Sequence, residues 1–184
     1  MAYETPVDEL QLQSDLRDPS KASAAFDKMM RLYGEKVYWQ IRKLLINHDD
    51  SVDMLQNVFL KAWNNLANFR GDARISTWLY KIAFNESINF LNKEKQKARR
   101  EVAEIDDAVM SQLESDPWFD GDELRKKLLA AVAALPEKQR LVFNMRYFDE
   151  MKYEEISEIL GTSVGSLKAS YHHAVKRIAK LFEE

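Results

Sequence analysis

The sequence predicts an all-α protein built from two small helical domains that are joined by an acidic linker. This fold class rests on three observations: turn-forming residues are scarce, apolar residues recur at helical spacing, and the charge pattern breaks once. The 184 residues include 5 glycines and 4 prolines, too few for the many turns of an all-β chain. The length suits one large domain or two small ones.

Charge divides the chain into three parts. Residues 1–100 carry 16 basic and 13 acidic side chains, residues 101–123 carry 9 acidic and no basic ones, and residues 124–184 carry 11 basic and 8 acidic ones. The net charge of −3 therefore hides two mildly basic blocks, each of which could meet a nucleic acid. We take residues 1–22 as an N-terminal tail, 23–100 as the first domain, 101–123 as the linker and 124–184 as the second domain. A solvated tether is expected for the linker, with a specific role as the alternative.

Several classes of protein are not expected. Without cysteine the chain has no disulfide framework and no thiolate metal site. The acidic N-terminus does not resemble a signal peptide, and no apolar run approaches the ~20 residues of a membrane span, so a cytoplasmic location is expected. Neighbouring histidines in a helix, His172 and His173, do not point at one metal. No phosphate-binding glycine loop, nucleophile elbow or paired-carboxylate motif occurs. We expect no catalytic site, no cofactor and no small-molecule substrate.

In the first domain, three long helices are predicted. Apolar residues at three- and four-residue steps indicate a helix from about Phe26 to Leu45. Asp49 or Asp50 is expected to cap a second helix, whose buried stripe is Val52, Leu55, Phe59, Ala62, Trp63 and Leu66. After a loop at residues 68–74, a third helix is expected from near Ser76 to about Lys97.

In the second domain, four shorter helices are predicted. The first runs from Leu124 to about Ala134, and the next begins after Pro136, a residue tolerated in a first helical turn, and ends near Phe148. Tyr153 begins the third, which ends at Gly161. Ser163 is expected to cap the fourth, over residues 164–182.

The last two helices carry helix-turn-helix spacing. A small residue, Ser157, is followed by Gly161 four positions later and by the apolar Leu167 six positions after that. The small side chain lets two helices approach, and glycine adopts the turn conformation. One side of the last helix is expected to be buried, through Leu167, Tyr171, Ala174, Ile178 and Leu181. The other side could enter a major groove, and it presents Lys168, Ala169, His172, His173, Lys176 and Lys180. An ordinary helical hairpin is the alternative.

The third helix of the first domain has an unusual polar stripe. At about 100° per residue, one narrow line holds Trp78, Asn85, Asn89, Asn92 and Gln96. Asparagine is a poor residue for a helix interior, whereas amides beside an aromatic ring can bind the edges and faces of unpaired bases. A solvent-exposed face with a core tryptophan explains the pattern equally well. The preceding helix exposes Asp53, Gln56, Asn57, Leu60, Lys61 and Asn64, and an apolar residue on that polar face points to a protein partner.

Together these segments resemble the extracytoplasmic-function (ECF) sigma factors of the sigma-70 family. Residues 51–63 look like the polymerase-binding helix of sigma region two, and residues 69–71 with 77–85 look like its promoter-melting segment. Residues 135–140 and the helix-turn-helix look like region four. The resemblance covers roughly residues 24–100 and 124–182. No segment that resembles the intermediate domain of housekeeping sigma factors lies between these two parts, and this points to the ECF group.

The resemblance implies a function and a set of partners. Such a protein would bind core RNA polymerase, placing Asp53, Gln56, Asn57, Leu60 and Lys61 on the β′ clamp helices and region four on the β-flap. The minus-ten element would be captured and its melted strand supported by Arg70, Gly71, Asp72, Ala73, Arg74, Ile75, Trp78, Tyr80, Asn85 and Asn89. The minus-thirty-five element would meet Ser166, Lys168, Ala169, Ser170, His172, His173 and Lys176. The linker would follow the RNA exit path, and an anti-sigma factor is the usual antagonist.

The chain departs from the family pattern at three positions, and two rival functions stay open. Asn57 stands where glutamate is frequent, and Ser170 and His173 stand where arginine is frequent, so the bidentate base contacts of arginine are not available there. One rival is a one-component helix-turn-helix regulator that binds duplex DNA without polymerase, which would leave the asparagine stripe unused. The other is an adaptor built from helical bundles that binds no DNA.

Overall fold

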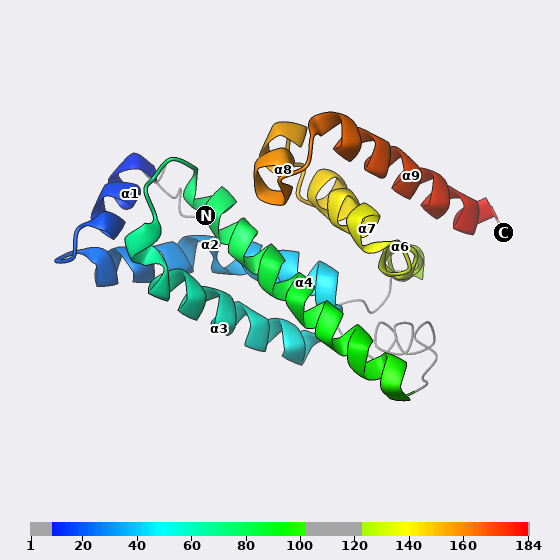
Figure 1. Cartoon of the computed structure of the whole chain (residues 1–184), viewed down its shortest axis with the longest axis horizontal. Helices are drawn as coiled ribbons and strands as arrows, with labels where there is room; N and C mark the ends of the chain where they lie inside the picture. The colour runs from blue at the N-terminus through cyan, green and yellow to red at the C-terminus, as the bar shows by residue number, and fades with distance from the viewer. Residues whose placement is uncertain (1–8, 102–122, 184) are drawn as a thin grey trace.

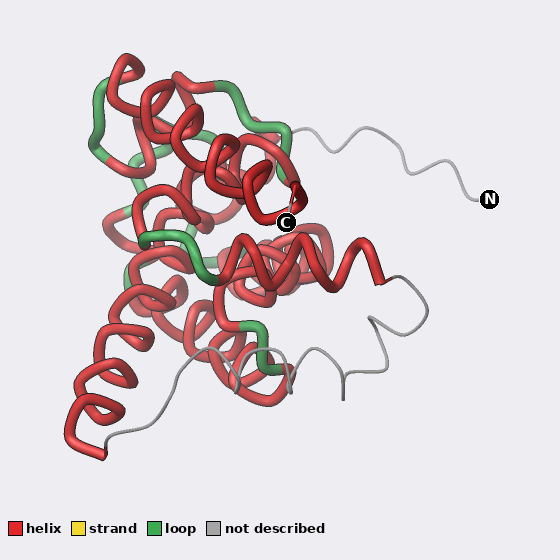
Figure 2. The backbone as a smooth tube through the Cα atoms, turned by 90° about the vertical axis from the view of Figure 1, so that its right-hand side faces the viewer, coloured by secondary structure: helices red, strands yellow, loops and turns green. Residues whose placement is uncertain are grey.

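The computed structural model describes residues 9–101 and 123–183, and within them it contains helices and connecting loops but no strand (Figures 1 and 2). The predicted all-α class with two helical domains is confirmed. The linker predicted at residues 101–123 lies outside the described residues except at its two ends. The helices of the first domain are α1 (Glu9–Arg17), α2 (Ala22–Leu45), α3 (His48–Asn64), the 3₁₀ turn η1 (Leu66–Asn68) and α4 (Ile75–Glu101). Those of the second are α6 (Glu123–Ala133), α7 (Glu137–Phe143), the π-helical segment η3 (Asn144–Phe148), α8 (Tyr153–Leu160) and α9 (Val164–Glu183).

Helices α2, α3 and α4 pack around the core of the first domain, and α1 closes one end of it (Figure 1). The fully buried residues come from all three long helices and include Met29, Val37, Ile41, Val58, Ile75 and Leu79. The cap of α3 differs from the prediction. Asn47, not Asp49 or Asp50, accepts a hydrogen bond from the Asp50 N–H at 3.0 Å. The two aspartates instead lie in the first turn, where a carboxylate stabilises the helix dipole.

The assignment of residues 1–22 to a tail is wrong for the residues of α1 and for the start of α2. Leu12 and Leu16 are four residues apart, lie on one face of α1 and are buried in the core of the first domain. A nine-residue helix is too short to be stable alone. Its helicity therefore depends on this packing, and the sequence pattern gave little sign of it. Residues 1–8 lie outside the described part of the chain.

The second domain has the predicted helices with one interruption. Pro136 immediately precedes α7, and the buried Arg140 donates to the carbonyl of Ala133 at 3.4 Å, while burial lowers the pKa of its guanidinium. The helix expected to continue to Phe148 winds into the π-helix η3 after Phe143. Gly161, with a φ of 59°, ends α8 as predicted. The Ser163 hydroxyl accepts the Ser166 N–H at 3.4 Å, which confirms the predicted cap of α9.

The two domains lie against each other, with α8 packed on α4 (Figure 1). Tyr80 and Phe84 of α4 pack into the apolar cluster that α8 and α9 share. A polar contact also joins the domains: Asp149 forms an ion pair with Lys43 and accepts a hydrogen bond from Gln40 at 3.3 Å. The helix-turn-helix therefore rests on the helix that carries the asparagine stripe.

Candidate nucleic-acid and polymerase interfaces

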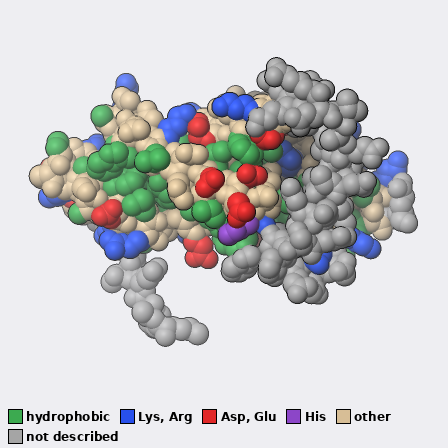
Figure 3. Space-filling view, turned by 90° about the horizontal axis from the view of Figure 1, so that it is seen from below, with side chains coloured by type: hydrophobic (Ala, Val, Ile, Leu, Met, Phe, Trp, Pro, Cys, Tyr) green, Lys and Arg blue, Asp and Glu red, His purple; other side chains and the backbone are tan. Residues whose placement is uncertain are grey.

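Helix α3 presents its predicted contact residues to solvent. Asp53, Gln56, Asn57, Leu60 and Lys61 are all exposed, and Lys61 forms an ion pair with Glu86 of α4. The Leu60 side chain is 62% exposed and Trp63 is 45% exposed. Figure 3 shows the molecule from below, the side on which α3 lies in Figure 1. Hydrophobic side chains gather on the left half of this view, and carboxylates lie near its middle. Exposed apolar surfaces of this kind are typical of sites that contact other proteins.

The buried stripe predicted for α3 is partly wrong. Met54 and Val58 face the core, whereas Val52 and Leu55 are only half-buried. Trp63 lies at the rim, with its ring edge-on to Phe26 at a centroid distance of 5.0 Å. Phe59, Ala62 and Leu66 are buried as predicted, so the predicted stripe is wrong at Val52, Leu55 and Trp63 only.

The loop between η1 and α4 is exposed at its charged side chains and buried at its end. Arg70, Asp72 and Arg74 are exposed, and Gly71 and Ala73 are half-buried. Ile75 was predicted to contact the minus-ten element, and this assignment is corrected: its side chain is 0% exposed and belongs to the core of the first domain. Gly71 has a φ of 79°, a conformation that other residues rarely adopt.

The predicted stripe on α4 separates into an exposed row and packed aromatic residues. Asn85, Asn89 and Asn92 are exposed. Trp78 is half-buried, and its ring lies against Phe69 at a centroid distance of 4.7 Å. Tyr80 lies between the two domains, where burial raises its pKa to about 12, so the phenol stays neutral at ordinary pH. The amides are thus free to meet a ligand, whereas the two aromatic rings take part in packing.

The outer face of α9 is exposed as predicted for Lys168, Ala169, His172, His173 and Lys176, whereas Ser166 and Ser170 are half-buried. The Lys168 ammonium lies 5.7 Å from the centre of the Tyr153 ring. A groove of about 440 Å³ runs beside this face, lined by Gln139, His173, Lys176, Arg177 and Lys180. Leu181 was predicted to be buried, but it is 54% exposed because α9 extends past the helices that cover its first turns.

Other kinds of site find little support in the described residues. Within residues 9–101 and 123–183 no three histidine, aspartate or glutamate side chains gather as metal ligands. Among the described helices, none is both long enough and apolar enough to span a bilayer.

Comparison with known proteins agrees with this geometry. The family model for sigma-70 region 2 matches residues 29–97, and that for sigma-70 region 4 matches residues 125–178. The chain is 32% identical over 164 residues to the ECF RNA polymerase sigma factor SigW of Bacillus subtilis, covering 85% of this chain and 88% of that one. It is 29% identical over 164 residues to the ECF RNA polymerase sigma-E factor of Escherichia coli K12, covering 84% of each chain.

Two solved structures share the fold. CnrH in complex with the cytosolic domain of CnrY superimposes with a TM-score of 0.71 at 20% identity, over 95% of this chain and 97% of that one. The sigma factor RpoE in complex with the anti-sigma factor NepR, from Bartonella quintana, gives 0.66 at 20% identity, over 86% and 96%. Two sigma-70 regions in this order define a sigma factor. The chain belongs to the ECF RNA polymerase sigma factors of the sigma-70 family.

Proposed function

We propose that this sigma factor docks on core RNA polymerase through α3 and opens promoter DNA with the surface around the start of α4. The single observation that carries the proposal is the exposed row Asn85, Asn89 and Asn92 on α4, the helix that follows the loop at residues 70–74 with its exposed charged side chains. A regulator that binds only duplex DNA has no use for such a row. Amides can hydrogen-bond the base edges that melting exposes.

Each exposed surface is assigned one partner, either polymerase or a promoter element. Asp53, Gln56, Asn57, Leu60 and Lys61 contact the β′ clamp helices, and the loop at residues 70–74 captures a base flipped from the minus-ten element. The face of α9 enters the major groove at the minus-thirty-five element, and the second domain contacts the β-flap. The half-buried Trp78 supports the melted strand through the part of its side chain that stays exposed.

An anti-sigma factor is the proposed antagonist. One fold neighbour was solved with the anti-sigma factor NepR and the other with the cytosolic domain of CnrY. The docked arrangement of the two domains leaves α3 uncovered within the described residues, so a protein antagonist could reach its apolar surface.

A transcription assay with purified components tests the function. Core RNA polymerase alone should not initiate from a promoter of this sigma factor on linear duplex DNA, and addition of the chain should produce a defined transcript. A chain that binds such DNA equally well with and without polymerase, and yields no transcript, would be a one-component regulator instead.

Strand opening should depend on the asparagine row. We expect Asn85→Ala combined with Asn89→Ala to lower the permanganate reactivity of minus-ten thymines on duplex promoters by about tenfold. Two hydrogen bonds of about 0.5–1.5 kcal/mol each are lost. The defect should shrink on a premelted template, where the cost of melting is already met, and affinity for core polymerase should not change. Equal reactivity in wild-type and variant would leave the row a solvated helix face.

Two lysines of α9 should contact different parts of the DNA: Lys168 the bases and Lys176 the phosphates. Lys168→Ala should reduce binding to the minus-thirty-five element in a sequence-dependent way, because its side chain lies near the start of α9, the part of a recognition helix that faces base edges. Lys176→Ala should weaken binding to all sequences and lower the salt slope by about one unit. Titration of holoenzyme with promoter DNA at several salt concentrations measures both. Identical slopes in all three proteins would show that Lys176 does not contact phosphate.

A further inference from the structure

Helix α1 contacts the backbone of the loop that precedes α4 at three places. The Glu9 carboxylate accepts the N–H of Ile75 at 2.8 Å, and the Gln13 amide donates to the carbonyl of Ala73 at 3.2 Å. The Arg17 guanidinium donates to the carbonyl of Arg70 at 3.0 Å. Positions four apart lie on one face of a helix, so one face of α1 holds both ends of the loop.

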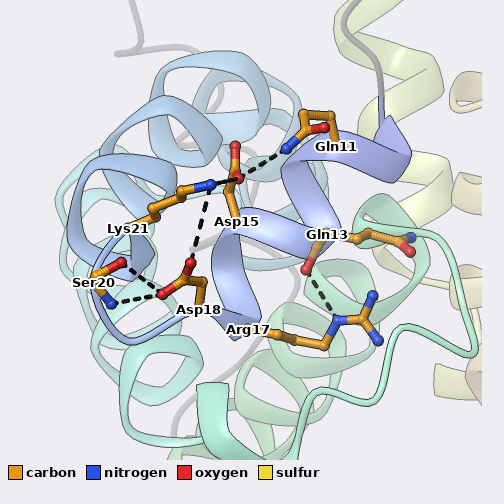
Figure 4. A network of polar contacts seen from close by, with 7 residues as sticks. All are labelled: Gln11, Gln13, Asp15, Arg17, Asp18, Ser20 and Lys21. Atoms are coloured by element: carbon orange, nitrogen blue, oxygen red, sulfur yellow. Dashed lines mark hydrogen bonds and ion pairs between the residues drawn. The ribbon is translucent and has the colours of Figure 1, made fainter.

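These side chains are themselves held in place. Gln13 is 7% exposed, and Arg17 Nε also donates to the Gln13 carbonyl at 3.2 Å. In Figure 4, Gln13 and Arg17 point to one side of α1, away from the polar contacts that join Asp15, Asp18 and Lys21. The face toward the loop is thus separate from the network that ties α1 to the start of α2.

The loop lies in close contact with this face. A Cβ atom at Gly71 would stand 3.3 Å from Gln13 Oε1 and 3.4 Å from Arg17 Cζ. Arg17 and Arg70 also line a groove of about 620 Å³, together with Leu16, Pro19, Ala22, Leu66, Ala67 and Phe69. Helix α1 thus supplies side-chain hydrogen bonds to the backbone at Arg70, Ala73 and Ile75.

We propose that Glu9, Gln13 and Arg17 are positioning residues that set the conformation of this loop and thereby its preference for the base that it captures. The inference rests on the proposed function of the loop. Reading a base by hydrogen bonds requires donors and acceptors held to within about 0.5 Å, and a loop that must be ordered on binding loses affinity and selectivity. None of the three side chains needs to touch DNA to have this effect.

Base preference in the holoenzyme gives the test. Holoenzyme is assembled from core polymerase with wild-type chain, Gln13→Ala, Arg17→Ala or the double variant, and a pool of single-stranded DNA of random sequence is selected on it and sequenced. Gln11→Ala is the matched control, because it removes the same side chain from the same helix, where the Gln11 amide donates to Asp15 within α1. Thermal midpoints and affinities for core polymerase are measured in parallel.

At the position of the base that the loop captures, we expect each single variant to reduce the enrichment of the preferred base by about three- to tenfold. This factor corresponds to the loss of one hydrogen bond. The neighbouring positions and the affinity for core polymerase should stay at wild-type values. Arg17→Lys, which keeps one donor, should fall between wild-type and Arg17→Ala. A merely structural role would lower the thermal midpoint and leave base enrichment unchanged.

A variant in the loop itself distinguishes failure of the inference about α1 from failure of the proposed function of the loop. Asp72→Ala changes an exposed side chain of the loop itself. If it alters base enrichment while the exposed Arg17→Ala does not, the loop reads the base and the inference about α1 is overturned. If neither variant alters it, the proposed function of the loop fails and the inference fails with it.

Discussion

Leu60→Asp is expected to weaken the affinity of this sigma factor for core RNA polymerase by about 100-fold. The Leu60 side chain is 62% exposed on the face of α3 that is proposed to dock, so the substitution should leave the fold intact. In the complex the side chain would be covered, and burying a carboxylate without a partner costs at least 2–3 kcal/mol. Fluorescence titration of labelled chain with core polymerase measures the change.

The matched control is Leu10→Asp on α1, where the side chain is 77% exposed in the same domain but away from α3. It should bind core polymerase like the wild type. Asp53→Ala with Gln56→Ala should give a smaller loss than Leu60→Asp, because truncation leaves no buried charge. If Leu60→Asp and Leu10→Asp bind equally well, α3 is not the docking helix.

Asp149→Ala is expected to separate the two domains of the free protein. The Lys43 and Asp149 side chains are 19% and 15% exposed, so removing the carboxylate leaves Lys43 and Gln40 without this acceptor in a mostly buried site. Such a loss costs about 1–3 kcal/mol, enough to shift the population of docked molecules by about fivefold or more. The ion pair between Arg74 and Glu155, with Arg74 71% exposed, contributes little by comparison.

Energy transfer between two dyes measures this separation. The chain has no cysteine, so dyes attach only where cysteines are introduced, for example at the exposed Lys36 of α2 and Lys180 of α9. Transfer efficiency should fall in Asp149→Ala, while Asp27→Ala, which changes an exposed aspartate of α2, should match the parent. Unchanged efficiency in Asp149→Ala would mean that apolar packing of Tyr80 and Phe84 holds the domains together without the ion pair.

The sequence alone determined the features that depend on local periodicity. The bounds of α8, the turn at Gly161 and the cap at Ser163 were all predicted, because each depends on residues within four positions of one another. The exposure of Leu60 and of Asn85 and Asn89 was predicted for the same reason: a helical repeat assigns faces before any packing partner is known. The site residues assigned from the family resemblance are largely exposed, and their contacts with DNA and polymerase stay predictions.

Only the tertiary structure decided the features that join distant parts of the chain. Ile75 follows an exposed loop and was assigned to DNA binding, but the core of the first domain buries it. Helix α1 is stabilised because Leu12 and Leu16 pack into that core. The Gln13 amide of α1 donates a hydrogen bond to the carbonyl of Ala73, 60 residues away. Lys43 meets Asp149 across 106 residues. Such contacts depend on how whole helices pack, and no repeat within one helix encodes which partner its face will meet.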